Sequence, residues 1–168
     1  MKMINKGLAL LYIIVILCTI FVSCNKSTDT NMLKSETTHD AVAITNATLS
    51  NSEECIVLEA IWNNESESII TYGNMFFLEV KKGGVWKSVP MIDGAMFTLE
   101  KLAVYPSSII SNFNDSGIEF INKGENIRLY ITNHYEVEKN NEYRVIIEFY
   151  EMTNKDEAYQ AFLYFTLS

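Results

Sequence analysis

From residue 54 onward, apolar and polar residues alternate with a period of two, which is the spacing of a β-strand that buries one face. The run ECIVLEAIW (54–62) places Ile56, Leu58, Ala60 and Trp62 on one side, and its β-branched residues favour a strand over a helix. No stretch after Asp40 shows sustained helical periodicity. Further strands are predicted at SIITYG (68–73), ENIRLYITN (125–133), EYRVIIEFYE (142–151) and AYQAFLYFTL (158–167).

A hairpin is predicted at MFFLEVKKGGVWKSVP (75–90), where two alternating runs flank Gly83-Gly84. The length of its loop decides the direction of Trp86. A two-residue turn sends Trp86 outward beside Lys81, whereas a three-residue loop pairs it with Val80 and turns it inward. A large aromatic residue in this setting is expected to be buried.

The last two predicted strands form a second hairpin around MTNKDE (152–157). Their apolar faces match only if the loop has an odd number of residues, such as three or five. Many short strands with turns between them predict an all-β sandwich or barrel. The large residues expected to face its core are Leu58, Trp62, Leu78, Ile147 and Phe165.

The N-terminus has the pattern of a secretory signal peptide. A basic start with Lys2 and Lys6 precedes fifteen uncharged residues, LALLYIIVILCTIFV, and Ser23 is a small residue. The window FVSC, ending at Cys24, resembles the lipobox of bacterial lipoprotein signals. That resemblance implies cleavage before Cys24, a diacylglycerol thioether on its sulfur, and a lipid-anchored protein on the extracytoplasmic face of the cell membrane. The alternative is an uncleaved transmembrane helix over residues 7–23.

The next segment, NKSTDTNMLKSETTHD, has too few large apolar residues to offset the entropy of ordering it. The sequence therefore predicts three parts. These are a lipoprotein signal peptide (1–23), a lipidated cysteine with a disordered tether (24–40), and one β-sandwich domain (41–168).

The charge balance excludes some partners. The chain has 13 basic and 21 acidic residues, and loss of residues 1–23 removes two lysines, which leaves 11 against 21 and a net charge of −10. Nucleic acid is not an expected partner, because its phosphates must be neutralised by Lys and Arg. The same net charge argues against electrostatic adhesion to an anionic lipid surface.

Candidate chemistry is sparse, and we predict a protein that is not an enzyme and has no metal or cofactor. Cys55 has no partner for a disulfide and is expected to be a small, half-buried residue. There is no Gly-x-Ser-x-Gly motif, and neighbouring acids such as Glu53 and Glu54 point to opposite faces of a strand. The stretch NFNDSG (112–117) resembles a calcium loop but has Lys123 at the twelfth position, so a plain loop is expected.

Several short motifs follow one order along residues 41–150: Asn64 in an Asn-rich turn, Tyr72-Gly73, Leu78-Glu79, Trp86, and Tyr143-Arg144. This order resembles a bacterial immunoglobulin-like domain family of Gram-positive surface lipoproteins. The resemblance implies an antiparallel immunoglobulin-like β-sandwich in an extracellular setting, not an activity. Tyr143 also resembles a tyrosine corner, in which the phenol bonds to upstream backbone.

A candidate interaction surface lies opposite the expected core on the last hairpin. It comprises Ile146, Tyr150, Phe162 and Tyr164, with Trp86 as a further member. The alternative, which we expect, is that the segment from Met91 to Gly124 covers this face.

Three functions are compatible with these features. The first is a membrane-anchored, non-catalytic module that binds an unknown envelope or extracellular protein or ligand. The second is a structural or accessory lipoprotein of a membrane sensor or transporter. The third is an envelope hydrolase, which requires a deep pocket with convergent polar groups.

Overall fold

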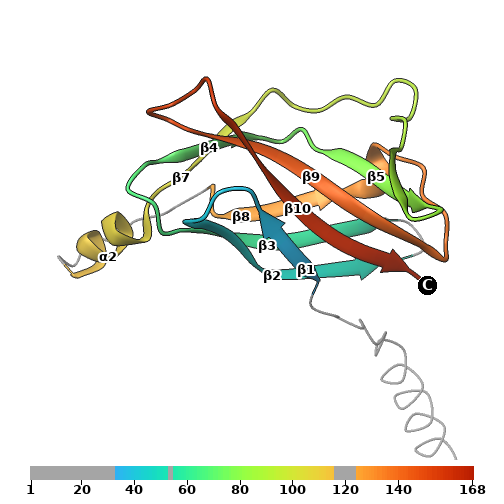
Figure 1. The fold of residues 1–168 in the computed structure, drawn as a ribbon, viewed down its shortest axis with the longest axis horizontal. Helices are drawn as coiled ribbons and strands as arrows, with labels where there is room; N and C mark the ends of the chain where they lie inside the picture. The colour runs from blue at the N-terminus through green and yellow to red at the C-terminus, as the bar shows by residue number, and fades with distance from the viewer. Residues whose placement is uncertain (1–32, 53–54, 116–123) are drawn as a thin grey trace, which may run out of the picture.

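The computed structural model describes residues 33–52, 55–115 and 124–168. In these ranges the chain is an all-β sandwich of two antiparallel sheets with a short α-helix at one end, as Figure 1 shows. The predicted all-β fold is therefore confirmed, whereas residues 1–23 and Cys24 lie outside the described residues. The elements are β1 (Lys34–Thr37), β2 (Val42–Asn51), β3 (Ile56–Asn64), β4 (Ile70–Gly73), β5 (Phe77–Lys82), β6 (Val85–Ser88), β7 (Lys101–Val104), α2 (Ser107–Asp115), β8 (Asn126–Tyr130), the 3-10 helix η1 (Ile131–Asn133), β9 (Asn141–Glu151) and β10 (Ala158–Leu167).

The larger sheet has the strand order β1-β10-β9-β4-β7, and the smaller sheet has the order β2-β3-β8. Strand β9 is 11 residues long, so two short strands can pair with it on one side. β4 pairs with Phe149–Glu151, and β5 pairs with Tyr143–Ile146. β6 then adds to β5 as the outer strand of that hairpin. β9 is therefore the strand that spans the larger sheet from end to end.

The β5–β6 hairpin has a two-residue turn. Gly83 and Gly84 have φ angles of 62° and 81°, a conformation that other residues rarely adopt. Lys81 is then opposite Trp86, which places the indole on the outer face of the sheet. The outward alternative is confirmed. The expectation that Trp86 is buried is wrong, because the parity of the turn overrides the preference of tryptophan for the interior; the side chain is half-buried.

The last hairpin has the predicted parity. Tyr143 is opposite Phe165 and Phe149 is opposite Tyr159, so the apolar faces of β9 and β10 match. Seven residues separate the paired Tyr150 and Ala158, which is an odd number.

The core lies between the two sheets. Trp62 in β3 of the smaller sheet contacts two rings of the larger sheet, Tyr72 at 5.4 Å and Phe149 at 5.1 Å between ring centroids. The five residues expected to face the core are at most 3% exposed: Leu58, Trp62, Leu78, Ile147 and Phe165. Packing of apolar side chains therefore joins the sheets.

Two buried tyrosines fix loops to this core. The hydroxyl of Tyr143 accepts a hydrogen bond from the backbone N–H of Glu138 at 2.7 Å and donates to its carbonyl at 3.1 Å. This is the predicted tyrosine corner. The hydroxyl of Tyr72 donates to the carbonyl of Gly124 at 2.8 Å, and burial raises the pKa of this phenol to about 12.

The domain begins earlier in the chain than predicted. Residues 34–37 form β1, which pairs with β10, so the expectation of a disordered tether that extends to Asp40 is wrong for residues 34–37. This strand is polar, so hydrogen bonds rather than burial of apolar side chains hold it in place. Ser35 Oγ donates to the carbonyl of Ile44 at 2.7 Å, and Thr37 Oγ1 donates to that of Val42 at 2.5 Å. Both bonds cross from β1 to β2 and close one side of the sandwich.

The helix α2 was not predicted. The stretch from Asn112 was expected to be a plain loop, but its first residues, 112–115, belong to this helix. Pro106 starts the helix, since its carbonyl accepts hydrogen bonds from Ile109 at 3.0 Å and Ile110 at 3.2 Å. Nine residues are too few for a periodic apolar pattern to stand out. In the part of the chain that the structure describes, no helix is long and apolar enough to cross a membrane.

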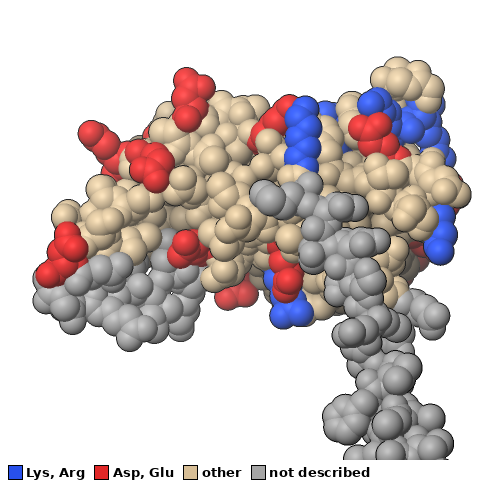
Figure 2. Space-filling model, turned by 90° about the horizontal axis from the view of Figure 1, so that it is seen from below, with Lys and Arg blue, Asp and Glu red and all other residues tan. Residues whose placement is uncertain are grey.

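Charged side chains are unevenly distributed along the sandwich. On the face that Figure 2 shows, the end that carries α2 has acidic side chains without Lys or Arg beside them, whereas on the other half Lys and Arg side chains lie among further acidic ones. The acidic end includes the β3–β4 turn with Glu65 and Glu67, and the β9–β10 loop with Asp156 and Glu157.

Candidate functional site

Cations and aromatic rings contact one another across the outer face of the larger sheet. The guanidinium of Arg144 in β9 lies 4.8 Å from the ring centroid of Trp86 and 5.1 Å from that of Phe162. The ammonium of Lys81 lies 5.4 Å from the Trp86 ring. Such contacts each contribute about 0.5–1 kcal/mol at exposed positions. We call this set of residues the cation–aromatic ladder: Lys34, Lys81, Trp86, Arg144, Phe162 and Tyr164.

Each cation of the ladder also has a carboxylate partner. Arg144 Nε is 2.6 Å from an oxygen of Glu79, and both side chains are mostly buried, at 22% and 18% exposure. Lys81 pairs with Glu142 at 2.9 Å. Lys34 pairs with Glu36 at 2.5 Å. The outer face is thus a packed network of side chains that links β6, β5, β9, β10 and β1.

These contacts leave less of the predicted interaction surface accessible to a partner. Trp86, Phe162 and Tyr164 do lie on one face, but their rings are in contact with the ladder cations and with each other, at 5.8 Å between Trp86 and Tyr164. Ile146 is only 8% exposed, and Tyr150 is half-buried. Three of the five predicted residues therefore share one face of the sheet, and whether that face binds a partner stays a prediction; the most accessible apolar side chains lie elsewhere.

Four of those accessible side chains lie on two segments that hydrogen bonds of Asn74 join, and we call them the apolar rim: Met75, Phe77, Met96 and Leu99. Their exposed fractions are 50%, 43%, 84% and 105%. Phe77 is opposite Ile146 on the outer face, so the rim continues from the predicted surface. The sequence carried no clear signal for the rim, because in AMFTL (95–99) Ala95, Phe97 and Leu99 alternate as in a strand while Met96 adds an apolar residue on the other side.

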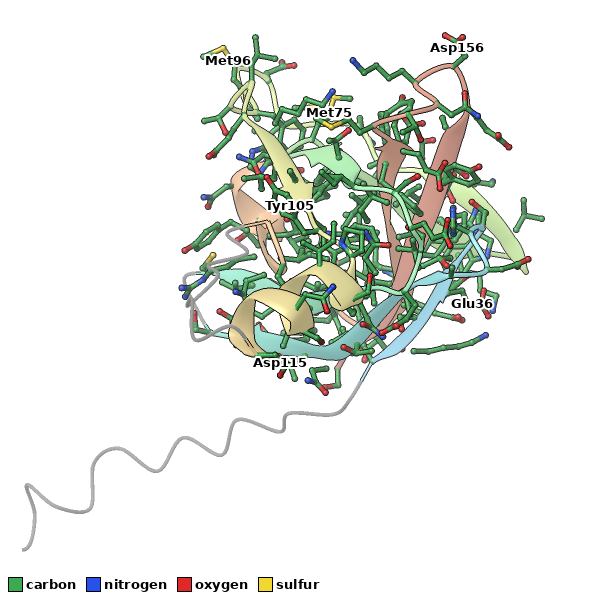
Figure 3. All side chains as sticks on the ribbon, turned by 90° about the vertical axis from the view of Figure 1, so that its left-hand side faces the viewer. Glu36, Met75, Met96, Tyr105, Asp115 and Asp156 are labelled. Carbon is green, nitrogen blue, oxygen red and sulfur yellow. The ribbon has the colours of Figure 1, made fainter. Side chains whose placement is uncertain are left out.

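A hydrogen-bonded loop holds the rim in place. The side-chain amide of Asn74 donates to Thr98 Oγ1 at 2.9 Å and to Glu100 Oε2 at 3.1 Å. The ring of Phe97 packs into the sandwich against Phe76 at 5.1 Å. Because Phe97 is anchored, its neighbours Met96 and Leu99 remain exposed. In Figure 3, Met75 and Met96 both lie toward the upper side of the view, away from Glu36 in β1.

The expectation that residues 91–124 cover the outer face is wrong for the part that the structure describes. Met91 forms a bridge with Tyr135, and Lys101–Val104 pairs with β4 as strand β7. Ser107 at the start of α2 donates to the carbonyl of Asn64 at 3.2 Å. This segment therefore follows an end and an edge of the sandwich.

An open groove of about 800 Å³ lies at the end that carries the β5–β6 hairpin. Its apolar lining includes Val80, Val89, Val137 and Tyr143. Lysines and acids line it together, namely Lys82, Lys87, Asp93, Glu136 and Glu138. A smaller hollow of about 360 Å³ lies beside the rim, lined by residues that include Phe76, Met96, Phe97, Arg128 and His134.

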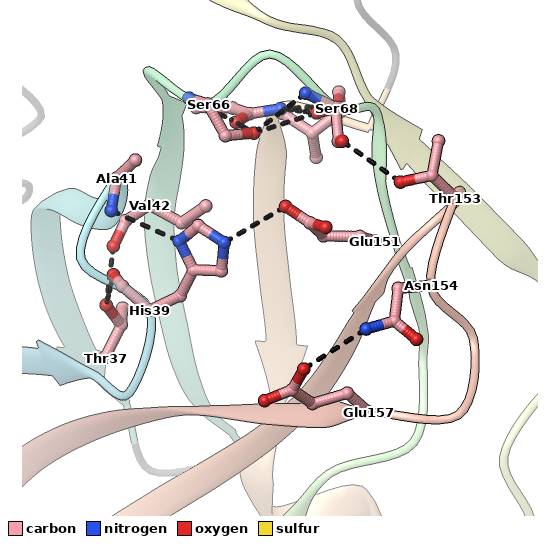
Figure 4. Close-up of polar contacts among 12 residues, drawn as sticks. Thr37, His39, Ala41, Val42, Ser66, Ser68, Glu151, Thr153, Asn154 and Glu157 are labelled. Atoms are coloured by element: carbon pink, nitrogen blue, oxygen red, sulfur yellow. Dashed lines mark hydrogen bonds and ion pairs between the residues drawn. The ribbon is translucent and has the colours of Figure 1, made fainter.

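The histidines are engaged in structural contacts. In Figure 4, His39 Nδ1 accepts a hydrogen bond from the backbone N–H of Ala41 at 3.2 Å, so the ring proton is on Nε2. Nε2–H then donates to Glu151 Oε1 at 3.2 Å. Because a catalytic histidine needs a nitrogen that can accept the proton of a nucleophile, His39 is not arranged as a general base. The ring of His134 stacks on Phe97 at 4.1 Å between centroids.

Cys55 is half-buried, as predicted, and its sulfur accepts a hydrogen bond from Thr132 Oγ1 at 3.5 Å. Among the residues that the structure describes, no three His, Cys, Asp or Glu side chains form a group that could hold a metal ion. Comparison with family models and with curated proteins found no match to this chain.

Proposed function

We propose that this chain is a lipid-anchored, non-catalytic module on the extracytoplasmic face of the cell membrane, where it binds another envelope or extracellular protein. The apolar rim is the observation that carries the binding role. Monomeric proteins rarely expose several large apolar side chains together, and methionine adapts well to partner surfaces. The all-β sandwich and the Tyr143 corner support an immunoglobulin-like domain.

The position of the rim favours a protein partner over the lipid bilayer. The proposed anchor, Cys24, precedes β1, and Figure 3 shows Met75 and Met96 on the side away from that strand. A rim on this side is available to a protein that approaches from outside. An accessory role beside a sensor or transporter would use the same surface. Both nitrogens of His39 are engaged, so this residue gives no support to a hydrolase.

The anchor is tested by a cysteine pair within the N-terminal segment. Cys24→Ala should abolish incorporation of radiolabelled palmitate and leave the leader uncleaved, because the acyl chains are attached through this sulfur. Cys18→Ala should leave both unchanged. Equal palmitate labelling of the Cys24→Ala protein would contradict the lipoprotein assignment.

The binding role is tested by a photo-activated amino acid at Leu99 in living cells, followed by mass spectrometry of the adducts. We expect one reproducible adduct protein, because Leu99 is fully exposed within the rim. The adduct should be lost when Met75→Ser and Met96→Ser are combined with the probe. The same probe at Glu67, exposed at the acidic end, is the control. Identical adducts from both positions, or none from Leu99, would refute the rim as a docking surface.

A further inference from the structure

The tip of the β5–β6 hairpin is an exposed cationic and apolar surface. Lys82, Val85 and Lys87 are all exposed, and Val85 has 61% of its surface accessible. In the described part of the chain, neither Lys82 nor Lys87 belongs to an ion pair. Val85 and Lys87, opposite Lys82 and Val80, point to the face of the hairpin that Trp86 does not occupy. Basic side chains beside an exposed apolar one are typical of segments that contact the headgroup region of a bilayer.

This tip lies at the end of the sheet from which the chain leaves toward Cys24. Lys34, the first residue of β1, has its ammonium 5.2 Å from the ring centroid of Tyr164. That ring is 5.8 Å from the ring of Trp86. Tyr164 is also paired with Arg144 near the start of β9. The start of β1 and the hairpin therefore belong to one end of the larger sheet.

Covalent geometry keeps this end close to the anchor. If Cys24 is lipidated, as the proposed function requires, nine residue steps connect the membrane surface to Leu33. An extended chain spans at most about 3.3–3.6 Å per residue, so Leu33 cannot be further than about 30 Å from the lipid. The acidic end of the sandwich has no such constraint.

The charges are separated by more than the range of electrostatic screening. β9 has 11 residues and is therefore about 35 Å long, several times the Debye length of about 8 Å at physiological salt. Glu65, Glu67, Asp156 and Glu157 lie at its far end, where an anionic surface near the hairpin barely affects them.

At the near end, positive and negative side chains are balanced. The ladder cations Lys34, Lys81 and Arg144 have carboxylate partners. Acids also line the groove beside Lys82 and Lys87, namely Asp93, Glu136 and Glu138. The positive surface is thus confined to the hairpin tip itself. The negative net charge of the whole chain therefore does not describe the charge of the hairpin tip that would face the membrane.

We propose that the hairpin tip, Lys82–Lys87, rests on an anionic phospholipid bilayer beside the lipid anchor, with the acidic end directed away from it. The lysine ammonium groups contact lipid phosphates, and Val85 lies at headgroup level. In the reversed orientation the acidic end would lie within the screening length of the same anionic surface and be repelled by it, which disfavours that orientation. The domain is then held at a fixed angle rather than rotating freely on its tether.

The test uses the full-length lipoprotein in vesicles of phosphatidylglycerol and phosphatidylcholine, with a nitroxide quencher on some lipid headgroups. A fluorophore is attached at Val85→Cys in a Cys55→Ser background, and at Glu67→Cys as the reference. We expect strong quenching at position 85 and little at position 67. Quenching at 85 should weaken when phosphatidylglycerol is omitted.

Charge variants distinguish contact between the hairpin tip and the bilayer from attachment through the lipid anchor alone. Lys82→Glu combined with Lys87→Glu should reduce quenching at position 85 to the level at position 67, while the protein still floats with the vesicles. Lys155→Glu, in the loop at the acidic end, should leave quenching at 85 unchanged. Equal quenching at 85 and 67 in protein that floats would overturn the orientation and leave the anchor intact. Protein that does not float would overturn the anchor, and the orientation with it.

Discussion

Replacing Trp62 with alanine is expected to lower the free energy of unfolding by about 3–5 kcal/mol. The indole is 1% exposed and contacts Tyr72 and Phe149 of the opposite sheet. Its removal leaves a cavity where the two sheets meet, and neighbouring rings held in regular strands can fill only part of it. Urea unfolding followed by circular dichroism measures the loss without relying on tryptophan fluorescence.

The other tryptophan provides the matched control. Trp86→Ala removes a ring of the same size from the outer face, where it contacts Arg144 and Lys81. Its loss should cost only about 1 kcal/mol, the value of one or two exposed cation–π contacts. If the two alanine variants were equally stable, the sheets would not be joined through Trp62.

Replacing Asn64 with aspartate is expected to destabilise the domain by about 3–5 kcal/mol at neutral pH. Asn64 is 1% exposed, and its amide nitrogen donates to the carbonyls of Ser68 at 2.9 Å and Val104 at 3.1 Å. Its oxygen accepts from the backbone N–H of Ser66 at 3.1 Å. Aspartate would place a buried negative charge against two carbonyl oxygens and remove both donors.

The measurement is the difference in unfolding free energy from the natural chain at pH 8 and at pH 4. A protonated carboxyl group can donate one hydrogen bond, so the deficit should shrink at the lower pH. Asn63→Asp is the neighbouring control. Asn63 Oδ1 only accepts, from Ser107 Oγ at 3.3 Å, and a carboxylate accepts equally well. The control should cost less than about 1 kcal/mol. A comparable loss at both positions would mean that a general charge effect, not the lost donors, is responsible.

Periodicity alone was sufficient for the longer strands. The alternation in β3 correctly predicts which side chains face the core, because one side of each strand is buried. These side chains are Ile56, Leu58, Ala60 and Trp62. The parity of the β9–β10 loop followed from the same requirement. The tyrosine corner could be recognised because its residue type and its place after a turn carry the signal.

Elements that depend on distant partners could not be found this way. β1 is polar, and only its pairing with β10 and its hydroxyl bonds to β2 make it a strand. The side chain of Trp86 points outward because the β5–β6 turn has two residues; a turn of three residues would have pointed it inward. The rings of Phe162 and Tyr164 could be placed on one face from the alternation of β10, but the cations on β9, β5 and β1 that contact the rings of this face are far away in sequence.

The amino-acid sequence by itself determined which side chains must be buried and that they lie on paired strands, because alternation records the contact of each residue with core or solvent. It also provided the lipobox-like FVSC window. Only the tertiary structure decided where charge and exposed apolar surface gather. The β5–β6 hairpin and the start of β1 come to one end, and the β3–β4 turn and the β9–β10 loop to the other, while hydrogen bonds of Asn74 join the segment of Met75 to that of Leu99. Such groupings arise from strand order and register, which cannot be inferred from the residues of any single segment.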